Sequence, residues 1–383
     1  MTKTLAIIGA SYLQLPLVLK ARELGLRSVC FAWEEGAICK EHADKFYPVS
    51  VIDKERICEL CAEEQIDGVC SIASDIVVPT IAYVAHRLGL PGNSEHSAHI
   101  SSNKYAMRQA LSSVGANCPR YARVRSLDEA KLALPQLRFP LIIKPSDRSG
   151  SLGVEKLEDS SRLAAALQLA LDSSFCKEAL LEEFIEQARE ISIESISYAD
   201  EHYILAITDK VTSGAPHFVE LAHHQPSDLP KPLIAEAIRQ TRLSLQALDI
   251  RNGASHCELM IDPNAQVYIT EIGARMGGDF IGSDLVQLST GYDFLKGVID
   301  VALGYFHPPK ISQHKHSGVY FYAPQNLWLK DLLQNPQQHP EIIKCEMHEE
   351  KLQELKQSAD RAGYCIYQAK QRFQPQETKL CKS

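Results

Sequence analysis

Residues 4–92 alternate short apolar runs with segments of helical periodicity, and this alternation restricts the fold more than any other feature of the chain. It predicts strands at residues 5–8, 28–31 and 69–72, and helices at residues 12–24, 54–64 and 76–88. Strands separated by helices predict βαβ units and a parallel sheet. Ligands of such sheets bind at the carboxyl ends of the strands. In this chain those ends carry Gly9-Ala10-Ser11 and Ala73-Ser74-Asp75.

The turn after the first strand does not match a dinucleotide-binding motif. The segment Gly9-Ala10-Ser11-Tyr12-Leu13-Gln14 lacks the second and third glycines of G-x-G-x-x-G. Tyr12 also stands near the place where a pyrophosphate would need to approach the backbone closely. An NAD-dependent oxidoreductase is therefore a disfavoured alternative.

The charge and composition of the chain exclude several classes of protein. Its 383 residues carry 40 Lys and Arg against 48 Asp and Glu, a formal charge of −8. A mildly acidic chain without a long basic run is a poor candidate for nucleic-acid binding. No apolar run is long enough for a membrane helix. Eleven cysteines without a signal-peptide pattern indicate reduced thiols. We expect a cytoplasmic protein that binds neither nucleic acid nor membrane.

A predicted hairpin at residues 255–275 opposes two carboxylates. Two apolar runs flank the turn signal Asp262-Pro263-Asn264-Ala265. If the hairpin is symmetric, Glu258 lies opposite Glu271 on one face, and Met260 and Ile269 share that face. Like charges directly opposite each other destabilise a sheet, and Mg²⁺ is commonly held by carboxylates together with phosphates. The pair is either a cation site or a solvent-exposed edge.

A strand ending in Lys144 precedes a loop rich in serine and glycine, Pro145-Ser146-Asp147-Arg148-Ser149-Gly150-Ser151-Leu152-Gly153. Backbone amides and small hydroxyls can surround phosphate oxygens. The loop is not a Walker A motif, because no G-K-[ST] follows, and an ordinary hairpin loop is an equal alternative. Lys104 lies in the first turn of a predicted helix, where the helix dipole disfavours a cation. An anionic ligand near Lys104 would offset that cost.

Taken in order, these segments resemble the ATP-grasp superfamily over nearly the whole chain. The resemblance rests on Ile8-Gly9-Ala10-Ser11, Asn103-Lys104, Phe139–Lys144, Ser149–Val154, Glu182–Ile185, Glu258–Met260 and Glu271–Arg275. It implies an α/β and α+β protein, with a Rossmann-like unit followed by an ATP-grasp fold. The expected divisions are 1–100 (Rossmann-like), 101–118 (linking helix), 119–185 (lid subdomain), 186–308 (catalytic subdomain with the metal site) and 309–383 (C-terminal α+β subdomain).

The resemblance also implies cofactors and roles for residues. The cofactors are ATP and Mg²⁺, with Mn²⁺ as an alternative, and the metal ligands are Glu258 and Glu271. The residues implied to bind ATP are Lys104, Lys144, Ser149, Gly150, Ser151, Gly153, Glu182, Glu183, Phe184, Ile185, Glu190, Lys210 and Met260. Arg275 is implied to act in catalysis together with Glu271, by steadying an acyl phosphate and its tetrahedral successor. Many members have Asn where this chain has Gly273, so either one metal ligand comes from elsewhere or the second ion is held more loosely.

Within the superfamily, the segment Phe218–His224 resembles the amino-acid site of dipeptide ligases. That likeness implies substrate contacts from Glu220, His223, Arg275, Gly278 and Asp279. It predicts an ADP-forming carboxylate–amine ligase that acts on small molecules, with an amino acid as a substrate, and a homodimer is a reasonable expectation. Two alternatives stay open: activation of bicarbonate or carbamate by the same fold, and non-catalytic nucleotide binding.

In the C-terminal segment we expect strands at residues 319–322 and 364–367 and a helix at residues 349–361.

Overall fold

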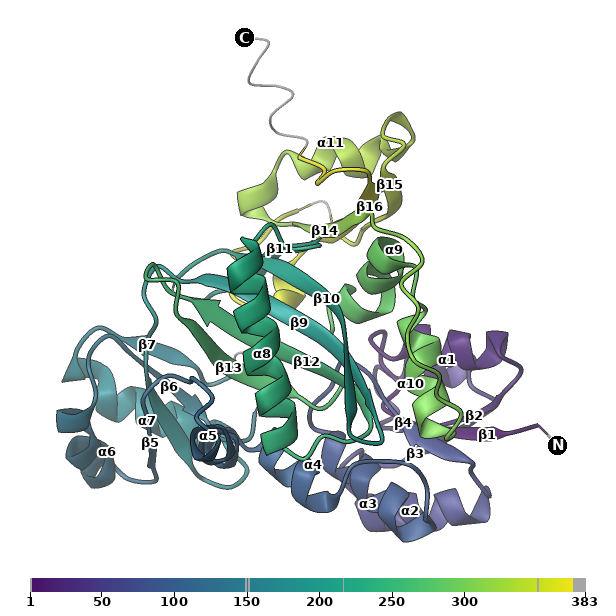
Figure 1. The fold of residues 1–383 in the computed structure, drawn as a ribbon, viewed down its shortest axis with the longest axis horizontal. Helices are drawn as coiled ribbons and strands as arrows, with labels where there is room; N and C mark the ends of the chain where they lie inside the picture. The colour runs from purple at the N-terminus through teal and green to yellow at the C-terminus, as the bar shows by residue number, and fades with distance from the viewer. Residues whose placement is uncertain (1, 149, 151, 216, 350, 375–383) are drawn as a thin grey trace.

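The computed structural model describes residues 2–374 except residues 149, 151, 216 and 350, and its strands form three sheets (Figure 1). The N-terminal sheet has the order β3-β2-β1-β4, and every pairing in it is parallel. Its strands are β1 (Thr4–Ile8), β2 (Arg27–Ala32), β3 (Lys45–Pro48) and β4 (Gly68–Cys70). The predicted Rossmann-like arrangement is therefore confirmed. Strand β3, which was not predicted, is a short edge strand with charged and proline ends.

Helices cover both faces of the N-terminal sheet, as alternating strands and helices require. On one face α2 (Lys54–Glu63) and α3 (Val78–Leu88) pack against Ile8 and Val29. On the other face α1 (Leu15–Glu23) packs together with α10 (Phe294–Ala302), which comes from much later in the chain. The three helices α1–α3 and strands β1–β4 are called the N-terminal unit below, and α10 connects it to the rest of the molecule.

A second sheet follows two short helices, α4 (Glu95–Ser102) and α5 (Lys104–Ser113). The side chain of Asn103 caps α5 by accepting a hydrogen bond from the Ala106 amide. The sheet is antiparallel, with the order β5-β8-β6-β7. Its strands are β5 (Tyr121–Val124), β6 (Leu141–Pro145), β7 (Glu155–Leu157) and β8 (Ala179–Glu183), and its helices are α6 (Leu127–Ala133) and α7 (Leu163–Ser173).

The third sheet has eight antiparallel strands in the order β13-β12-β9-β10-β11-β14-β16-β15. They are β9 (Arg189–Tyr198), β10 (Glu201–Thr212), β11 (Glu220–Gln225), β12 (Gly253–Ile261), β13 (Val267–Gly273), β14 (His316–Tyr322), β15 (Ile342–Met347) and β16 (Gly363–Ala369). Helix α8 (Lys231–Ala247) crosses one face, where Ala237 and Leu245 pack on Ile193 and Leu259 (Figure 1). Because β14 pairs with β11, the C-terminal strands extend this sheet.

The prediction of a helix at residues 349–361 is wrong. Its described part has only a short 3₁₀ turn, Ser358–Asp360, and the unpredicted strand β15 and helix α11 (Leu329–Gln334) precede it. Leu355 packs with Val219 and Leu221, whereas Leu352 packs against a different cluster around Tyr320. One helical face could not serve both clusters, so the segment does not form an α-helix.

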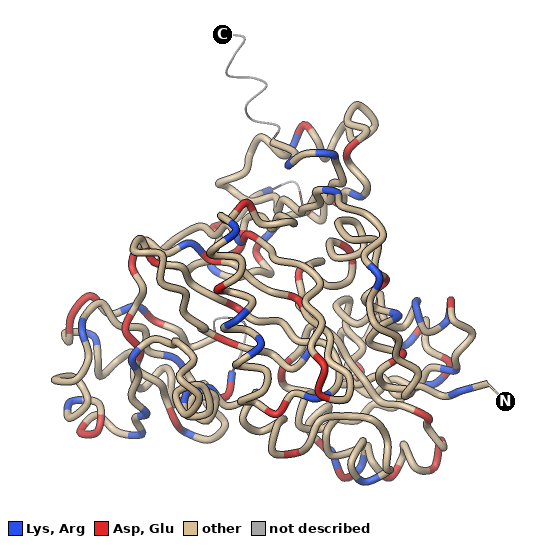
Figure 2. Tube along the Cα trace, in the orientation of Figure 1, with Lys and Arg blue, Asp and Glu red and all other residues tan. Residues whose placement is uncertain are grey.

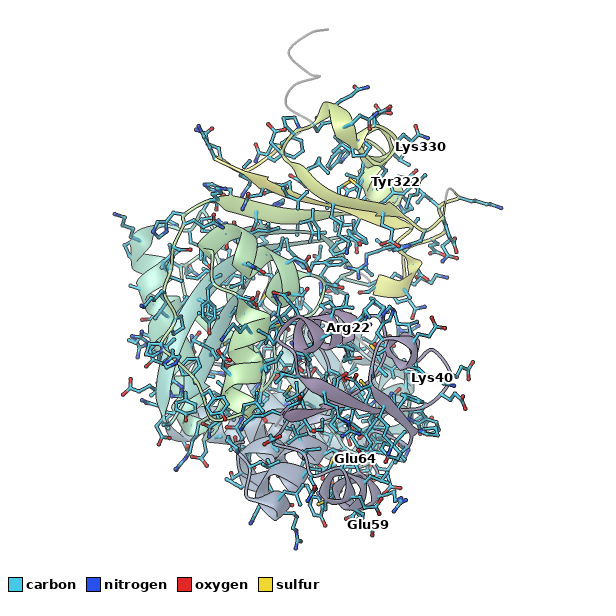
Figure 3. The ribbon with its side chains drawn as sticks, turned by 90° about the vertical axis from the view of Figure 1, so that its right-hand side faces the viewer. Arg22, Lys40, Glu59, Glu64, Tyr322 and Lys330 are labelled. Carbon is cyan, nitrogen blue, oxygen red and sulfur yellow. The ribbon has the colours of Figure 1, made fainter. Side chains whose placement is uncertain are left out.

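The N-terminal unit and the C-terminal strands lie at different ends of the large sheet. Figure 3 labels Arg22, Lys40 and Glu64 on the N-terminal unit, and Tyr322 and Lys330 at the C-terminal end. Acidic and basic residues are scattered over all parts of the described trace (Figure 2). Among the described residues, no helix is both long and apolar enough to cross a membrane.

Candidate active site

Lys144 and Glu182 form the centre of a buried charge cluster on the second sheet. Lys144 Nζ lies 2.5 Å from Glu182 Oε2, and Arg108 Nε of α5 lies 2.5 Å from Glu182 Oε1. Burial would raise the pKa of Glu182, but Arg108 and Lys144 outweigh it and hold that pKa below its usual value. Burial lowers the pKa of Lys144, against the pull of Glu182. These three residues, called the basic cluster, carry two cations and one carboxylate.

Lys104 connects this cluster to the hairpin. It is the first residue of α5 and is almost fully buried. Its Nζ donates to the Arg148 carbonyl at 2.7 Å and lies 2.8 Å from Glu271 Oε1. The cost of placing a cation in the first helical turn is thus offset by the Glu271 carboxylate of the third sheet.

The loop after Lys144 has two glycines in left-handed backbone conformations, Gly150 (φ 69°) and Gly153 (φ 71°). A Cβ at Gly153 would also lie 2.7 Å from Ser173 Oγ. Ser149 and Ser151, which the resemblance assigns to ATP, lie outside the described residues.

The chain leaving β8 packs beside an aromatic contact. The amides of Glu183 and Phe184 donate to the carbonyls of Arg120 and Pro140, each at 2.9 Å. The rings of Phe184 and Phe218 have centroids 5.8 Å apart. Ile185 follows and is half-buried, as is Met260 on β12.

Lys210 on β10 is the centre of a second, oppositely charged cluster. Its Nζ lies 2.5 Å from Glu190 Oε1, 2.7 Å from Glu258 Oε1 and 3.7 Å from Glu220 Oε1. Burial lowers the pKa of Lys210, but the surrounding carboxylates, Glu190 first, raise it well above the usual value. The four side chains come from four strands of the large sheet. This group, called the acidic cluster, has three carboxylates and one cation.

Glu258 and Glu271 are direct partners across the hairpin, as predicted. The hairpin is not symmetric as expected, because its register shifts between Glu258 and Leu259. As a result, Leu259 pairs with Ile269. The shift turns Ile269 into the fully buried core beneath α8. The expectation that Met260 and Ile269 share a face is therefore wrong. A symmetric hairpin and a bulged one give the same glutamate pair here.

Arg275 follows the hairpin and contacts the N-terminal unit. Its Nε lies 2.9 Å from Asp75 Oδ1 and its Nη2 lies 3.0 Å from Asp75 Oδ2. Burial lowers the pKa of Arg275, but Asp75 outweighs it and the net shift is upward. Asp75 stood at a predicted strand end, yet nothing in the sequence indicated that it pairs with Arg275, which is 200 residues away.

Comparison with known proteins relates part of this chain to a known domain family. Residues 137–284 match the family profile described as "ATP-grasp domain". These residues are an ATP-grasp domain. Both charge clusters include residues within it.

Two curated relatives and two solved structures resemble the chain. The alanine–anticapsin ligase of Bacillus subtilis is 25% identical over 244 residues, covering 56% of this chain and 51% of that protein. The C-terminal section of the carbamoyl phosphate synthase large chain of Aquifex aeolicus is 22% identical over 265 residues, covering 68% and 48%. The chain spans about half the length of these curated relatives.

Among solved structures, an L-amino acid ligase from Bacillus licheniformis superposes with a TM-score of 0.83 at 22% identity, covering 99% of this chain and 96% of that one. An N5-carboxyaminoimidazole synthetase from Staphylococcus aureus, complexed with ADP, gives 0.79 at 18% identity, covering 100% and 98%. These likenesses show that the chain shares its fold with these structures over almost its whole length.

The ATP-grasp domain offers two carboxylates to a cation. The side chains of Glu258 and Glu271 are 29% and 26% exposed, so both remain accessible. Within the described part of the chain, no group of three or more His, Cys, Asp or Glu is arranged around a common metal position. Two carboxylates fit Mg²⁺, which usually completes its oxygen shell with phosphates and water.

A buried pair that sequence reasoning missed supports one of these carboxylates. His256 Nδ1 contacts Glu194 Oε1, and its Nε2 lies 3.3 Å from Glu258 Oε1. Burial lowers the pKa of His256, but Glu194 outweighs it and raises that pKa to about 9. Glu194 also accepts the Gly277 amide at 3.1 Å. His256 stood two residues before Glu258 in the hairpin, but Glu194 carried no signal.

Three of the residues assigned to the amino-acid substrate, Glu220, His223 and Asp279, lie near the C-terminal segment, whereas Arg275 contacts the N-terminal unit. His223 Nε2 lies 4.0 Å from Asp279 Oδ2, and neither ring nitrogen of His223 hydrogen-bonds within the described residues. Arg361 makes two contacts of 2.8 Å with Asp279. Glu220 accepts a hydrogen bond from Ser358 Oγ at 3.3 Å. The segment around Arg361 was not expected here.

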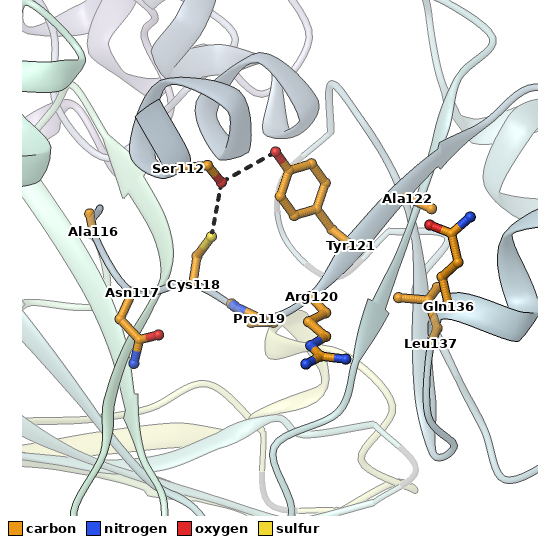
Figure 4. A pocket seen from close by; sticks show the side chains of 10 residues that line it. All are labelled: Ser112, Ala116, Asn117, Cys118, Pro119, Arg120, Tyr121, Ala122, Gln136 and Leu137. Carbon is orange, nitrogen blue, oxygen red and sulfur yellow. Dashed lines mark hydrogen bonds between the residues drawn. The ribbon is translucent and has the colours of Figure 1, made fainter. Parts of the chain in front are cut away.

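A separate cavity of about 390 Å³ lies beside the segment that enters β5 (Figure 4). Ser112, Cys118 and Tyr121 line it, and Arg120 is the charged residue of its described lining. Neither cluster's members line this cavity, so it is not part of the candidate site.

Proposed function

We propose that the protein is an ATP-dependent, Mg²⁺-requiring carboxylate–amine ligase that forms an amide or peptide bond and releases ADP and phosphate. The observation that carries this proposal is the placement of the basic and acidic clusters on two sheets, joined by the Glu258–Glu271 hairpin. Lys104 bridges from the basic side to Glu271. Such a site can hold a polyphosphate at one end and its cation at the other.

The reaction would proceed in two steps. A substrate carboxylate attacks the γ-phosphate of ATP in line and forms an acyl phosphate. An amine then attacks the acyl carbon and releases phosphate. Positioning and electrostatic stabilisation supply most of the catalysis in phosphoryl transfer. Lys104 and Lys144 would bind phosphate oxygens, and Arg275 would bind the oxygens that gain charge on the acyl group.

A bound Mg²⁺ would neutralise charge on the β- and γ-phosphates. Glu258 and Glu271 would hold the ion, and Lys210 and His256 keep Glu258 in place. Glu190 would contact ribose, and the chain from Glu182 to Ile185 would lie along adenine. In the free protein the Glu182 carboxylate is occupied by Arg108 and Lys144.

We assign an amino acid as one substrate because His223, Glu220 and Asp279 lie together. An ammonium group would meet Glu220 or Asp279. Asp279 is held by Arg361 at 2.8 Å, whereas the ion pair of Glu220 with Lys210 is longer, at 3.7 Å, so Glu220 has the freer carboxylate. We infer a cytoplasmic enzyme that acts on small molecules as a homodimer.

Activation of bicarbonate is the second candidate, favoured by the likeness to carbamoyl phosphate synthase and N5-carboxyaminoimidazole synthetase. The test measures ADP and phosphate release with Mg·ATP across single amino acids, amino-acid pairs and bicarbonate. We expect release that needs a pair, with a condensed product detected by mass. Release with bicarbonate alone would support the second candidate, and nucleotide binding without any release would contradict both.

A further inference from the structure

Asp75 and Arg275 join the N-terminal unit to the ATP-grasp domain through a two-point ion pair. Nε and Nη2 of the guanidinium face the two carboxylate oxygens at 2.9 and 3.0 Å. The side chains are 17% and 16% exposed. A planar guanidinium held at two points by a carboxylate cannot rotate freely. The pair therefore fixes the orientation of Arg275.

Gly273 leaves the space that this pair occupies. A Cβ added at Gly273 would lie 2.6 Å from Asp75 Oδ1 and 3.0 Å from Arg275 Cζ. A Cβ carbon 2.6 Å from an oxygen overlaps it sterically, so any side chain at position 273 would displace the ion pair. Glycine is needed here for close approach, not for an unusual backbone angle.

The backbone holds the same two loops together. The Ala73 amide donates to the Met276 carbonyl at 3.1 Å. A Cβ at Gly278 would be in ordinary contact with Ala73 Cβ, at 3.5 Å. The loop after β4 and the loop after β13 are thus one packed unit. Of the guanidinium nitrogens, Nη1 makes the longest contact, 3.4 Å to the Met276 carbonyl.

We propose that Asp75 is a positioning residue, which holds the Arg275 guanidinium in the orientation in which it would meet the reacting oxygens. The proposal rests on the function proposed above, because it takes the acyl phosphate as the group that Arg275 meets. The N-terminal side of the molecule would then contribute to catalysis by orienting Arg275. The proposal also explains why position 273 is Gly in this chain.

A docking role is the rival explanation, since any ion pair between the two parts could hold them together. The chain supplies a matched control. Lys20 of α1 lies 2.9 Å from Asp293 Oδ2, at the start of α10. This pair also joins the N-terminal unit to a later segment, but it lies outside the candidate site. Docking alone would make the two pairs equivalent in their effect on turnover.

The test compares Asp75→Asn, Gly273→Ala and Lys20→Gln in the full-length protein. We expect Asp75→Asn and Gly273→Ala to lower kcat by about 10–100-fold, the usual effect of losing a supporting contact. The KM for ATP should change by less than about 3-fold, and combining the two substitutions should add little. Lys20→Gln should leave kcat within about 2-fold. An unchanged kcat in Asp75→Asn, or an equal loss in Lys20→Gln, would overturn the proposal.

Crystal structures of the wild type and Asp75→Asn separate this proposal from the proposed function. We expect the Arg275 side chain to leave its wild-type position in the variant. If wild-type protein releases no ADP with any substrate, the proposed function fails, and the position of Arg275 still decides the inference. An Arg275 that keeps its place without Asp75 contradicts it. Gly273→Ala gives the same readout if Asp75→Asn does not fold.

Discussion

Lys144 and Lys210 are both largely buried lysines in contact with glutamates, yet the charged side chains around them differ in net sign. Lys144 shares one carboxylate, Glu182, with Arg108. Lys210 faces Glu190, Glu220 and Glu258, and His256 also contacts Glu258. The pKa of Lys144 is accordingly lowered, by burial first, whereas carboxylates overcome burial and raise the pKa of Lys210 well above normal.

The difference shows what each cluster lacks. Burying unbalanced charge is costly, so each cluster is poised for a ligand of the opposite sign. Surplus positive charge around Lys144 suits phosphate oxygens, and surplus negative charge around Lys210 suits a divalent cation. A nucleotide with its metal ion satisfies both clusters at once.

The largest effect is expected for Glu271→Gln, which removes one charge from the carboxylate pair between the clusters. We expect turnover to fall by roughly 1000-fold or more, because charge stabilisation supplies most of the rate in such reactions. Circular dichroism and unfolding midpoint should stay close to the wild type. Glu59→Gln, on the exposed face of α2, is the control. A Glu271→Gln protein with full activity would remove the metal assignment.

Lys210→Met tests the acidic cluster, because it removes the cation of that cluster. The change leaves Glu190 and Glu258, which are only partly exposed, without their shared cation, and we expect a loss of about 3 kcal/mol in the free energy of unfolding. Urea denaturation measures it. Added Mg²⁺ should restore part of the loss, because the ion replaces the missing positive charge. Equal stability of Lys210→Met and wild type would mean that the three carboxylates do not repel one another.

Lys144→Met tests the basic cluster, and we expect it to weaken ATP binding more than it lowers stability. Arg108 still pairs with Glu182, so the loss of stability should be smaller than for Lys210→Met. ATP affinity should fall by roughly 10–100-fold, the value of one charge-assisted hydrogen bond. Calorimetric titration of both variants with Mg·ATP checks this. Unchanged affinity in Lys144→Met would exclude the phosphate role.

The smallest effect is a pH dependence of ATP binding. Because its pKa is lowered below the ordinary 10.5, Lys144 loses its proton, and its charge, earlier as pH rises. Wild-type affinity should therefore weaken as the pH rises at values below 10.5, where an ordinary lysine would keep its charge. Lys144→Arg should show a flatter profile, since guanidinium stays protonated there. Matching profiles for the two proteins would rule out Lys144 as the titrating group.

The sequence predicted local features well and distant pairings poorly. The strand–helix alternation identified three of the four N-terminal strands, and the turn at Asp262 gave the partners Glu258 and Glu271. A bulge has no sequence signature in this hairpin, so the burial of Ile269 was missed. The failed helix at residues 349–361 had apolar residues at helical spacing, but tertiary packing separated them.

The site contacts that were missed join residues far apart in the chain. Asp75 and Arg275 are 200 positions apart, and Arg108 and Glu182 are 74 apart. Such pairs depend on how the sheets pack against one another, which periodicity does not encode. Lys104 was the exception, because its poor placement in the helix dipole indicated a missing anionic partner.

The most direct test of the opposed clusters is calorimetric titration of the protein with ATP, with Mg²⁺ and then with the metal chelated. We predict that Mg²⁺ tightens binding by about 10-fold or more, since ATP alone would bring its phosphates against Glu258 and Glu271 uncompensated. Glu258→Gln should bind ATP with a much smaller dependence on Mg²⁺. Equal affinity with and without the metal in wild-type protein would contradict the account.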